Sequence, residues 1–291
     1  MSLPVKTTGS HKHHYVPEFY LKRWAGVDGR LCEFTRRPQG LRSRMTHPGG
    51  AGYEVNLYSI PSLGPTQANI LEDRFFRTTD QFASDALTAF EVSGTHDLSV
   101  DLRSGWSRFI RSLQERNPDR LAWLKEECRR GLAERYKEIE KNYATWRLPG
   151  DPLTFADARK KLDDDRAKDK MWAILLQKVI DSKEVGSFLN AMRWLTLEIG
   201  KTDRSFLTSD NPVVMSNGIA YAGSSIAVPI GPNRLFVAVN NPEAEAQLRA
   251  MDVDKIITFM NDRVVKRAQK FVYGTDARQF RFVENRLCRP S

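Results

Sequence analysis

The chain has 291 residues, 41% of them hydrophobic, and 45 Lys and Arg side chains against 36 Asp and Glu give a formal net charge of +9. That composition supports a substantial core, and no apolar run approaches the roughly 20 residues that cross a bilayer, which excludes a function inside the membrane. Residues 1–14 lack the apolar core of a secretory signal, so we predict a cytoplasmic protein. The basic excess favours polyanionic partners, with nucleic acid or a nucleotide as the first candidates.

The N-terminal region carries the densest chemical signal. Three of the five histidines, His11, His13 and His14, precede an amphipathic segment at residues 17–24 whose leading proline favours a helix start. We predict that residues 1–12 form a disordered leader, in which His11 fits an expression tag as well as a native residue. In an extended segment His13 and His14 point to opposite faces, so at most two of the three histidines serve one centre. Imidazole suits metal ligation and proton transfer, and the alternative is structural hydrogen bonding to the backbone.

A hairpin is predicted next, from residues 31–35 and 41–45 separated by Pro38-Gln39-Gly40. Residues 30–44 hold five arginines against the single acid Glu33. This basic segment is the best candidate for contact with a polyanion, and we expect Arg36 and Arg37 to bind substrate there. The alternative is a solvated face that binds nothing specific. Residues 55–60 predict one further strand.

The middle of the chain is predicted to be helical over residues 67–90 and 102–115, where apolar residues recur at helical spacing. Residues 119–146 carry opposite charges three and four positions apart, which indicates a partly exposed helical arm, and another helix runs to about residue 179. Short strands are then predicted at residues 194–199, 206–208, 213–215, 226–230 and 235–239. Helices at 242–251 and 253–268 and strands at 271–273 and 280–283 complete the chain.

These elements predict an α+β fold, in which a helical middle region packs on a mixed or antiparallel sheet formed by N-terminal and C-terminal strands. Neither set of strands is large enough to be stable alone, so we expect them to pair with each other. Residues 13–291 are predicted to be a single elaborated domain with a helical insertion at about residues 100–182. The three cysteines are widely separated, which argues against disulfides, and we expect all three thiols to be shielded.

The string His13-His14-Tyr15-Val16-Pro17-Glu18-Phe19-Tyr20-Leu21 resembles the opening motif of the bacterial domain-of-unknown-function family 4238. Three later stretches fit the same pattern in the same order: Glu54-Val55-Asn56-Leu57-Tyr58, residues 109–116, and Thr208-Ser209-Asp210-Asn211-Pro212-Val213. The chain departs from the pattern at Glu18, where the family string carries glutamine. The resemblance implies a common fold and a shared site, and it implies no particular reaction.

Further candidate residues lie within or near these stretches. Asp210 and Asn211 follow an apolar run, and the alternative for both is ordinary turn chemistry. Glu72, on a predicted helix, could bring a carboxylate towards the histidines, or it could pair with a surface arginine. Gln114 and Arg116 close the helix at residues 102–115, where Arg116 either clamps a phosphate or bonds the last helical carbonyls.

Two hypotheses follow for function. The first is a metal-assisted phosphodiesterase or nuclease-like enzyme, and the second is a non-catalytic nucleic-acid or anion-binding regulatory module. In the first, the catalytic residues are His13, His14 and Asp210, the ligands of a divalent metal ion are His13, Glu72 and Asp210, and the substrate-binding residues are Asn211, Gln114, Arg116, Arg36 and Arg37. The absence of a dense acidic cluster weakens the enzyme hypothesis, whereas a polar site drawn from distant segments favours it.

Overall fold

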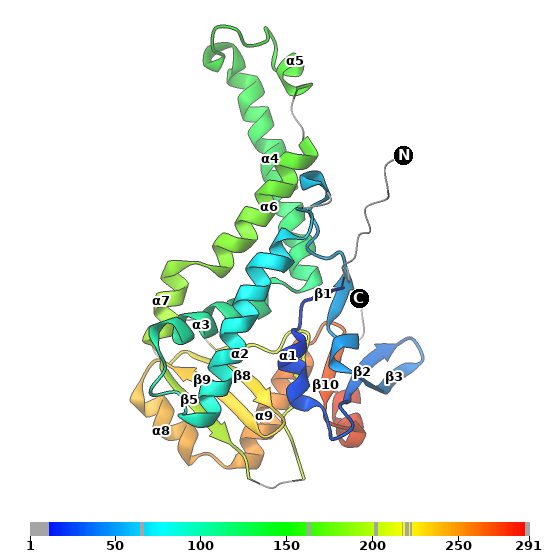
Figure 1. Cartoon of the computed structure of the whole chain (residues 1–291), viewed down its shortest axis with the longest axis vertical. Coiled ribbons are helices and arrows are strands. Elements are labelled where there is room, and N and C mark those ends of the chain that lie inside the picture. The colour runs from blue at the N-terminus through cyan, green and yellow to red at the C-terminus, as the bar shows by residue number, and fades with distance from the viewer. Residues whose placement is uncertain are drawn as a thin grey trace, which may run out of the picture.

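The computed structural model describes residues 12–64, 67–161, 164–200, 203–216, 218, 221 and 223–288, without the side chain of residue 164. The predicted leader, His11 included, lies outside the described residues apart from residue 12. Figure 1 shows a body of sheets and short helices from which two long helices project. The architecture is α+β, as predicted.

The N-terminal quarter alternates short strands and single helical turns. Its elements are β1 (Lys12–His14), α1 (Glu18–Leu21), the 3₁₀ turn η1 (Lys22–Trp24), β2 (Leu31–Arg37), β3 (Gly40–Thr46), η2 (Pro48–Gly50), β4 (Tyr53–Val55) and η3 (Pro61–Leu63). The predicted helix and hairpin are confirmed. The predicted strand at residues 55–60 is wrong, because Asn56 takes a positive φ of 59° that ends β4 at Val55.

The middle of the chain is helical, as predicted. It comprises the π-helix η4 (Leu71–Phe76), α2 (Arg77–Val92), α3 (Val100–Glu115), α4 (Pro118–Trp146), α5 (Phe155–Arg159), α6 (Asp164–Ile180) and α7 (Lys183–Ala191). Side-chain caps fix several starts: the Ser99 hydroxyl accepts from the Leu102 N–H, and Asn117 Oδ1 accepts from the N–H groups of Asp119 and Arg120. The sequence pattern did not predict α5 or α7.

The C-terminal third contains β5 (Arg193–Glu198), β6 (Thr208–Ser209), β7 (Val214–Ser216), β8 (Ser225–Gly231), β9 (Arg234–Val239), α8 (Pro242–Ala250), α9 (Val253–Arg267), β10 (Phe271–Gly274), η5 (Ala277–Gln279) and α10 (Phe280–Glu284). The strand expected at residues 280–283 is instead helix α10, which packs Val283 against β2 and β3. Among the cysteines, Cys32 and Cys128 are buried, whereas Cys288 is exposed, contrary to expectation.

The strands form three antiparallel groups in the described part of the chain. They are the ribbon β1-β4, a sheet with strand order β3-β2-β10-β6, and a sheet with strand order β5-β9-β8-β7. The predicted pairing of N-terminal and C-terminal strands is therefore present in the β3-β2-β10-β6 sheet. The remaining C-terminal strands form a sheet of their own, which the sequence pattern did not separate from the first.

The β5-β9-β8-β7 sheet is covered on both faces, since successive residues of a strand point to opposite sides. Phe236 of β9 packs against Phe90 of α2 and Trp106 of α3. On the other face, Leu235 and Val237 join the apolar residues of α9. Figure 1 shows α2 and α3 over one side of this sheet. Within the described helices, none is both long and apolar enough to cross a membrane.

Helix α1 connects the N-terminal ribbon to both sheets. The Tyr20 hydroxyl lies 2.8 Å from Thr208 Oγ1 in β6 and donates to the Pro229 carbonyl in β8 at 2.6 Å. Trp24 Nε1 donates to the Phe206 carbonyl at 2.8 Å. Both aromatic side chains are fully buried. The segment that carries the histidines is therefore held by the core and not by local structure alone.

Candidate functional site

The β1-β4 ribbon sends the two neighbouring histidines to opposite sides. Its antiparallel register places His13 opposite Glu54 and His14 opposite Tyr53. His13 is 2% exposed, stacks on the Tyr58 ring with an interplanar angle of 4°, and accepts the Tyr58 backbone N–H at Nδ1 over 2.9 Å. An imidazole held in this way orders the turn after β4. His13 therefore has the structural role, hydrogen bonding to the backbone, that was the alternative to metal ligation or proton transfer.

His14 faces a cavity of about 310 Å³, lined by His14, Pro17, Glu18, Phe19, Glu72, Arg77, Asp80, Gln81 and Ser84. We call it the His14 pocket. Burial lowers the pKa of His14, against the opposing effects of Glu18 and of a hydrogen bond with the Gly49 backbone. His14 Nε2 is buried without a hydrogen-bond partner. When Nδ1 donates to the Gly49 backbone, Nε2 keeps its lone pair.

Glu72 reaches the same cavity from the π-helix η4. The wider turn of a π-helix alters the phase of the side chains on either side, and such turns occur frequently at functional sites. The Glu72 carboxylate accepts the backbone N–H of His14, which ties η4 to β1, and its Oε2 is buried without a partner. Burial raises the pKa of Glu72 to about 7, although the charge of Arg116 lowers it. The alternative of a surface pair is not seen, since Arg77 contacts Asp73 instead.

Arg116 and Asp80 form a partly buried ion pair beside these two groups. The Arg116 side chain is fully buried, and its Nη1 lies 3.0 Å from Asp80 Oδ1. Its Nε and Nη2 have no hydrogen-bond partner, and its backbone carbonyl accepts the Tyr58 hydroxyl at 2.6 Å. Burial raises the pKa of Asp80 to about 6, and Arg116 opposes that shift. Arg116 does not line the cavity, so it acts on the pocket through its charge and through Asp80.

The pocket therefore combines a proton acceptor with a proton donor. Near neutral pH, the lowered pKa keeps His14 unprotonated, whereas the raised pKa leaves Glu72 a share of its proton. Environments that push two titratable groups in opposite directions are typical of general acid–base pairs. Five buried atoms without a hydrogen-bond partner belong to these site residues: His14 Nε2, Glu72 Oε2, Asp80 Oδ1, and Nε and Nη2 of Arg116.

Asp210 lies in a different place. It lines a cavity of about 590 Å³ with Tyr15, Arg37 and Lys270 among others, and that cavity does not include His14. Its two oxygens accept the backbone N–H groups of Gln269, Lys270 and Phe271 at 2.7–2.8 Å. Burial raises the pKa of Asp210 to about 6 despite these three donors. Its carboxylate is thus used to fix the loop before β10.

The other predicted substrate-binding residues make structural contacts. Asn211 lies in a serine-type turn, in which its backbone N–H donates to Ser209 Oγ, and its Nδ2 donates to the Arg267 carbonyl. Gln114 Nε2 contacts Met215 Sδ at 2.8 Å. Arg36 donates to the carbonyl of Glu284, the last residue of α10, and to the carbonyl of Leu287, which follows that helix. Arg37 is exposed at the end of the hairpin and lines the Asp210 cavity.

The predicted metal ligands are dispersed. His13 is stacked in the interior, Glu72 lines the His14 pocket, and Asp210 lines the other cavity. Within the described ranges, no group of three or more His, Cys, Asp and Glu side chains is arranged to hold a metal ion.

Asp80 is the member of the site that sequence reasoning missed. It lies four residues after buried Phe76 and three before buried Ala83, so it interrupts the apolar stripe of α2. A carboxylate inside an apolar stripe is the signal that would have found it, because an acid is rarely buried without a partner.

The fold and the pocket define an α+β protein in which His14 and Glu72 line one cavity. A family model described as a protein of unknown function (DUF4238) matches residues 12–278. Because the match covers most of the chain, the protein belongs to this family, and the resemblance drawn from its four sequence stretches is confirmed. No curated protein and no solved structure matches the chain.

Proposed function

We propose that the protein is a nuclease-like phosphodiesterase in which His14 is the general base and Glu72 the general acid. The observation that carries the proposal is the presence of His14 Nε2 and Glu72 Oε2, both unpartnered, on groups that line one cavity and have opposite pKa shifts. The net charge of +9 favours a polyanionic substrate. Arg77 lines the pocket with a side chain that is 76% exposed, and its contact with Asp73 at 3.5 Å is open to competition from a phosphate.

If the substrate is RNA, its own 2′-hydroxyl is the nucleophile, so the protein does not have to supply one. His14 Nε2 takes the proton of the 2′-hydroxyl as the O2′–P bond forms, and Glu72 gives its proton to the departing O5′ as the P–O5′ bond breaks. The products are a 2′,3′-cyclic phosphate and a 5′-hydroxyl. Glu72 is then a carboxylate and His14 an imidazolium, and a proton exchange with water restores both. DNA lacks the internal nucleophile, so cleavage of RNA in preference to DNA is expected.

The test incubates the protein with RNA, DNA and nucleotides, each in EDTA and with Mg²⁺, Mn²⁺ or Zn²⁺. RNA cleavage in EDTA supports the acid–base pair, and cleavage that requires a metal supports the metal-assisted alternative. His14→Gln and Glu72→Gln should each lower kcat by about 10²- to 10⁴-fold. His96→Gln is the matched control, because His96 is exposed and outside the pocket.

Thermal melting of every variant separates lost chemistry from lost folding. The proposal fails if the wild-type protein cleaves none of the substrates, or if both pocket variants cleave at the wild-type rate. Binding of RNA or nucleotides without any turnover would favour the non-catalytic module.

A further inference from the structure

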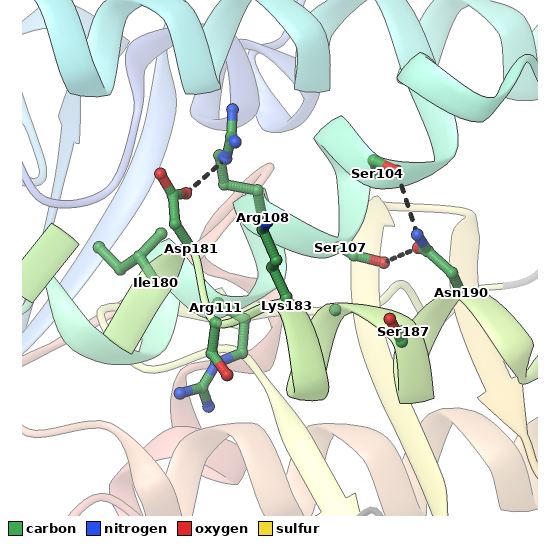
Figure 2. Close-up of a pocket in the computed structure, with 11 residues that line it drawn as sticks. Ser104, Ser107, Arg108, Arg111, Ile180, Asp181, Lys183, Ser187 and Asn190 are labelled. Carbon is green, nitrogen blue, oxygen red and sulfur yellow. Dashed lines mark hydrogen bonds and ion pairs between the residues drawn. The ribbon is translucent and has the colours of Figure 1, made fainter. Parts of the chain in front are cut away.

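A third cavity lies between α3 and the junction of α6 with α7, and its volume is about 300 Å³. Figure 2 shows Ser104, Ser107, Arg108 and Arg111 on the α3 side and Lys183, Ser187 and Asn190 on the α7 side. None of its lining residues belongs to the His14 pocket.

The ionisable groups of this cavity are mostly cationic. Arg108, Arg111 and Lys183 line it, against the single carboxylate of Asp181. Arg108 Nε lies 2.6 Å from Asp181 Oδ1, and both side chains are more than a third exposed, so the pair is open to competition from another anion. Lys183 is exposed and has no ion-pair partner among the described residues. Arg111 also lines the cavity, but its Nη2 lies 3.6 Å from Glu115 Oε1 and donates to the Val179 carbonyl, so its charge is already partly balanced.

Neutral hydrogen-bonding groups complete the lining. Asn190 accepts from the Ser107 hydroxyl at 2.6 Å and donates to Ser104 Oγ at 3.1 Å, as the dashed lines in Figure 2 mark. Because Ser104 Oγ accepts that bond, its own proton remains available to a ligand. Ser187 adds a second hydroxyl. Guanidinium, ammonium and hydroxyl donors together match the three acceptor oxygens of a phosphoryl group.

We propose that this cavity binds a phosphoryl group, either as free phosphate or as a phosphate ester. The oxygens of the ligand contact Arg108, Lys183 and the Ser104 hydroxyl, and they displace Asp181 from Arg108. This site is separate from the proposed catalytic pocket, so its test does not depend on any cleavage activity.

Gly186 supplies a test that changes no charge. It lines the cavity from within α7, and a Cβ added to it would have no heavy atom within 4 Å. Glycine in a helix interior costs roughly 1 kcal/mol relative to alanine, so a larger residue with good helix propensity should not destabilise α7. Gly186→Leu should therefore fold normally and fill part of the cavity.

The experiment measures binding of inorganic phosphate, AMP and a 5′-phosphorylated oligonucleotide by isothermal titration calorimetry at one ionic strength. Lys183→Gln should weaken binding about tenfold, because a charge-assisted bond is lost. Asp181→Asn should tighten binding, because it frees Arg108. Gly186→Leu should abolish it. Lys178→Gln is the matched control, since Lys178 is exposed on α6 and does not line the cavity.

The three ligands identify the source of the phosphoryl group. Phosphate and AMP binding indicates a small-molecule site, whereas binding of the oligonucleotide alone indicates a contact for a nucleic-acid end. Either pattern supports the proposal only if Lys183→Gln weakens the interaction more than Lys178→Gln does. The proposal is wrong if none of the ligands binds, or if the three cavity variants bind as the wild-type protein does.

Discussion

At the scale of single residues, His14 and Glu72 set the pH range in which the proposed acid–base pair operates. The base requires neutral His14, whose pKa burial lowers, and the acid requires protonated Glu72, whose pKa burial raises to about 7. The value of kcat/KM on RNA should therefore rise with pH through the lowered His14 pKa, reach its maximum in mildly acidic solution and fall above about pH 7. Rate measurements from pH 4.5 to 9 check this. A rate that keeps climbing to pH 9 would exclude Glu72 as the acid.

Asp210 shows why residue type and motif alone did not predict the role of a side chain correctly. Its position in a family-like string suggested catalysis, but its three N–H donors come from residues 269–271, whose proximity only the fold reveals. Asp210→Asn places an amide NH₂ where an acceptor is needed. We expect the free energy of unfolding to fall by about 2–4 kcal/mol, as for a buried network left partly unpaired. Urea denaturation measures it, with half-buried Asn211→Ala as a control that removes one bond to the Arg267 carbonyl and should cost well under half as much.

At the scale of elements, the turn before β4 holds the histidine strand in place. The Gly52 carbonyl accepts the N–H groups of both Tyr15 and Val16, and Gly52 has a φ of 62°. A Cβ at Gly52 would lie 2.8 Å from Val16 Cβ. Gly52→Ala should lower the free energy of unfolding by about 2–4 kcal/mol, because backbone strain and overpacking add. Gly94→Ala is the matched control: its φ is 71° but nothing lies within 4 Å of an added Cβ, so only the strain of about 1–2 kcal/mol remains. Equal losses in urea denaturation would show that the contact with Val16 is unimportant.

The elements themselves followed from the sequence wherever one periodicity was sustained. The long helices α3 and α4 and the strands β8 and β9 were predicted closely, because their apolar residues repeat over many positions. Some short elements were not: α10 has only five residues, and its aromatic positions fit a strand equally well. The His14 pocket was predicted only in part. His14 and Glu72 were both candidates. That they line one cavity depends on the π-helix η4, and helical periodicity in a sequence does not reveal a π-helix.

At the scale of the whole molecule, the projecting arm is joined to a body that draws strands from both halves of the chain. Helices α4 and α6 pack against each other, and Figure 1 shows them extending away from the sheets to α5. The tip is closed by a small apolar cluster in which Tyr136 and Tyr143 contact Phe155. Within the body, β2 pairs with β10 and β10 pairs with β6. The sheet thus links residues before the arm to residues after it.

A cut at the arm tip should therefore leave the molecule assembled. The loop between α4 and α5 exposes Leu148 by 69% and Leu153 by 79%, and Arg147 before it offers trypsin an accessible site. Limited trypsin treatment should first cut after Arg147, as the masses of the two fragments will show, and the fragments should elute together in size-exclusion chromatography. The two fragments should stay together because the β2-β10 pairing and the contact of α4 with α6 both join residues on opposite sides of the cut. Arg147→Gln should delay this first cleavage. Early separation of the fragments would show that the covalent connection through the arm tip, and not the shared sheet or the α4–α6 contact, holds the two halves together.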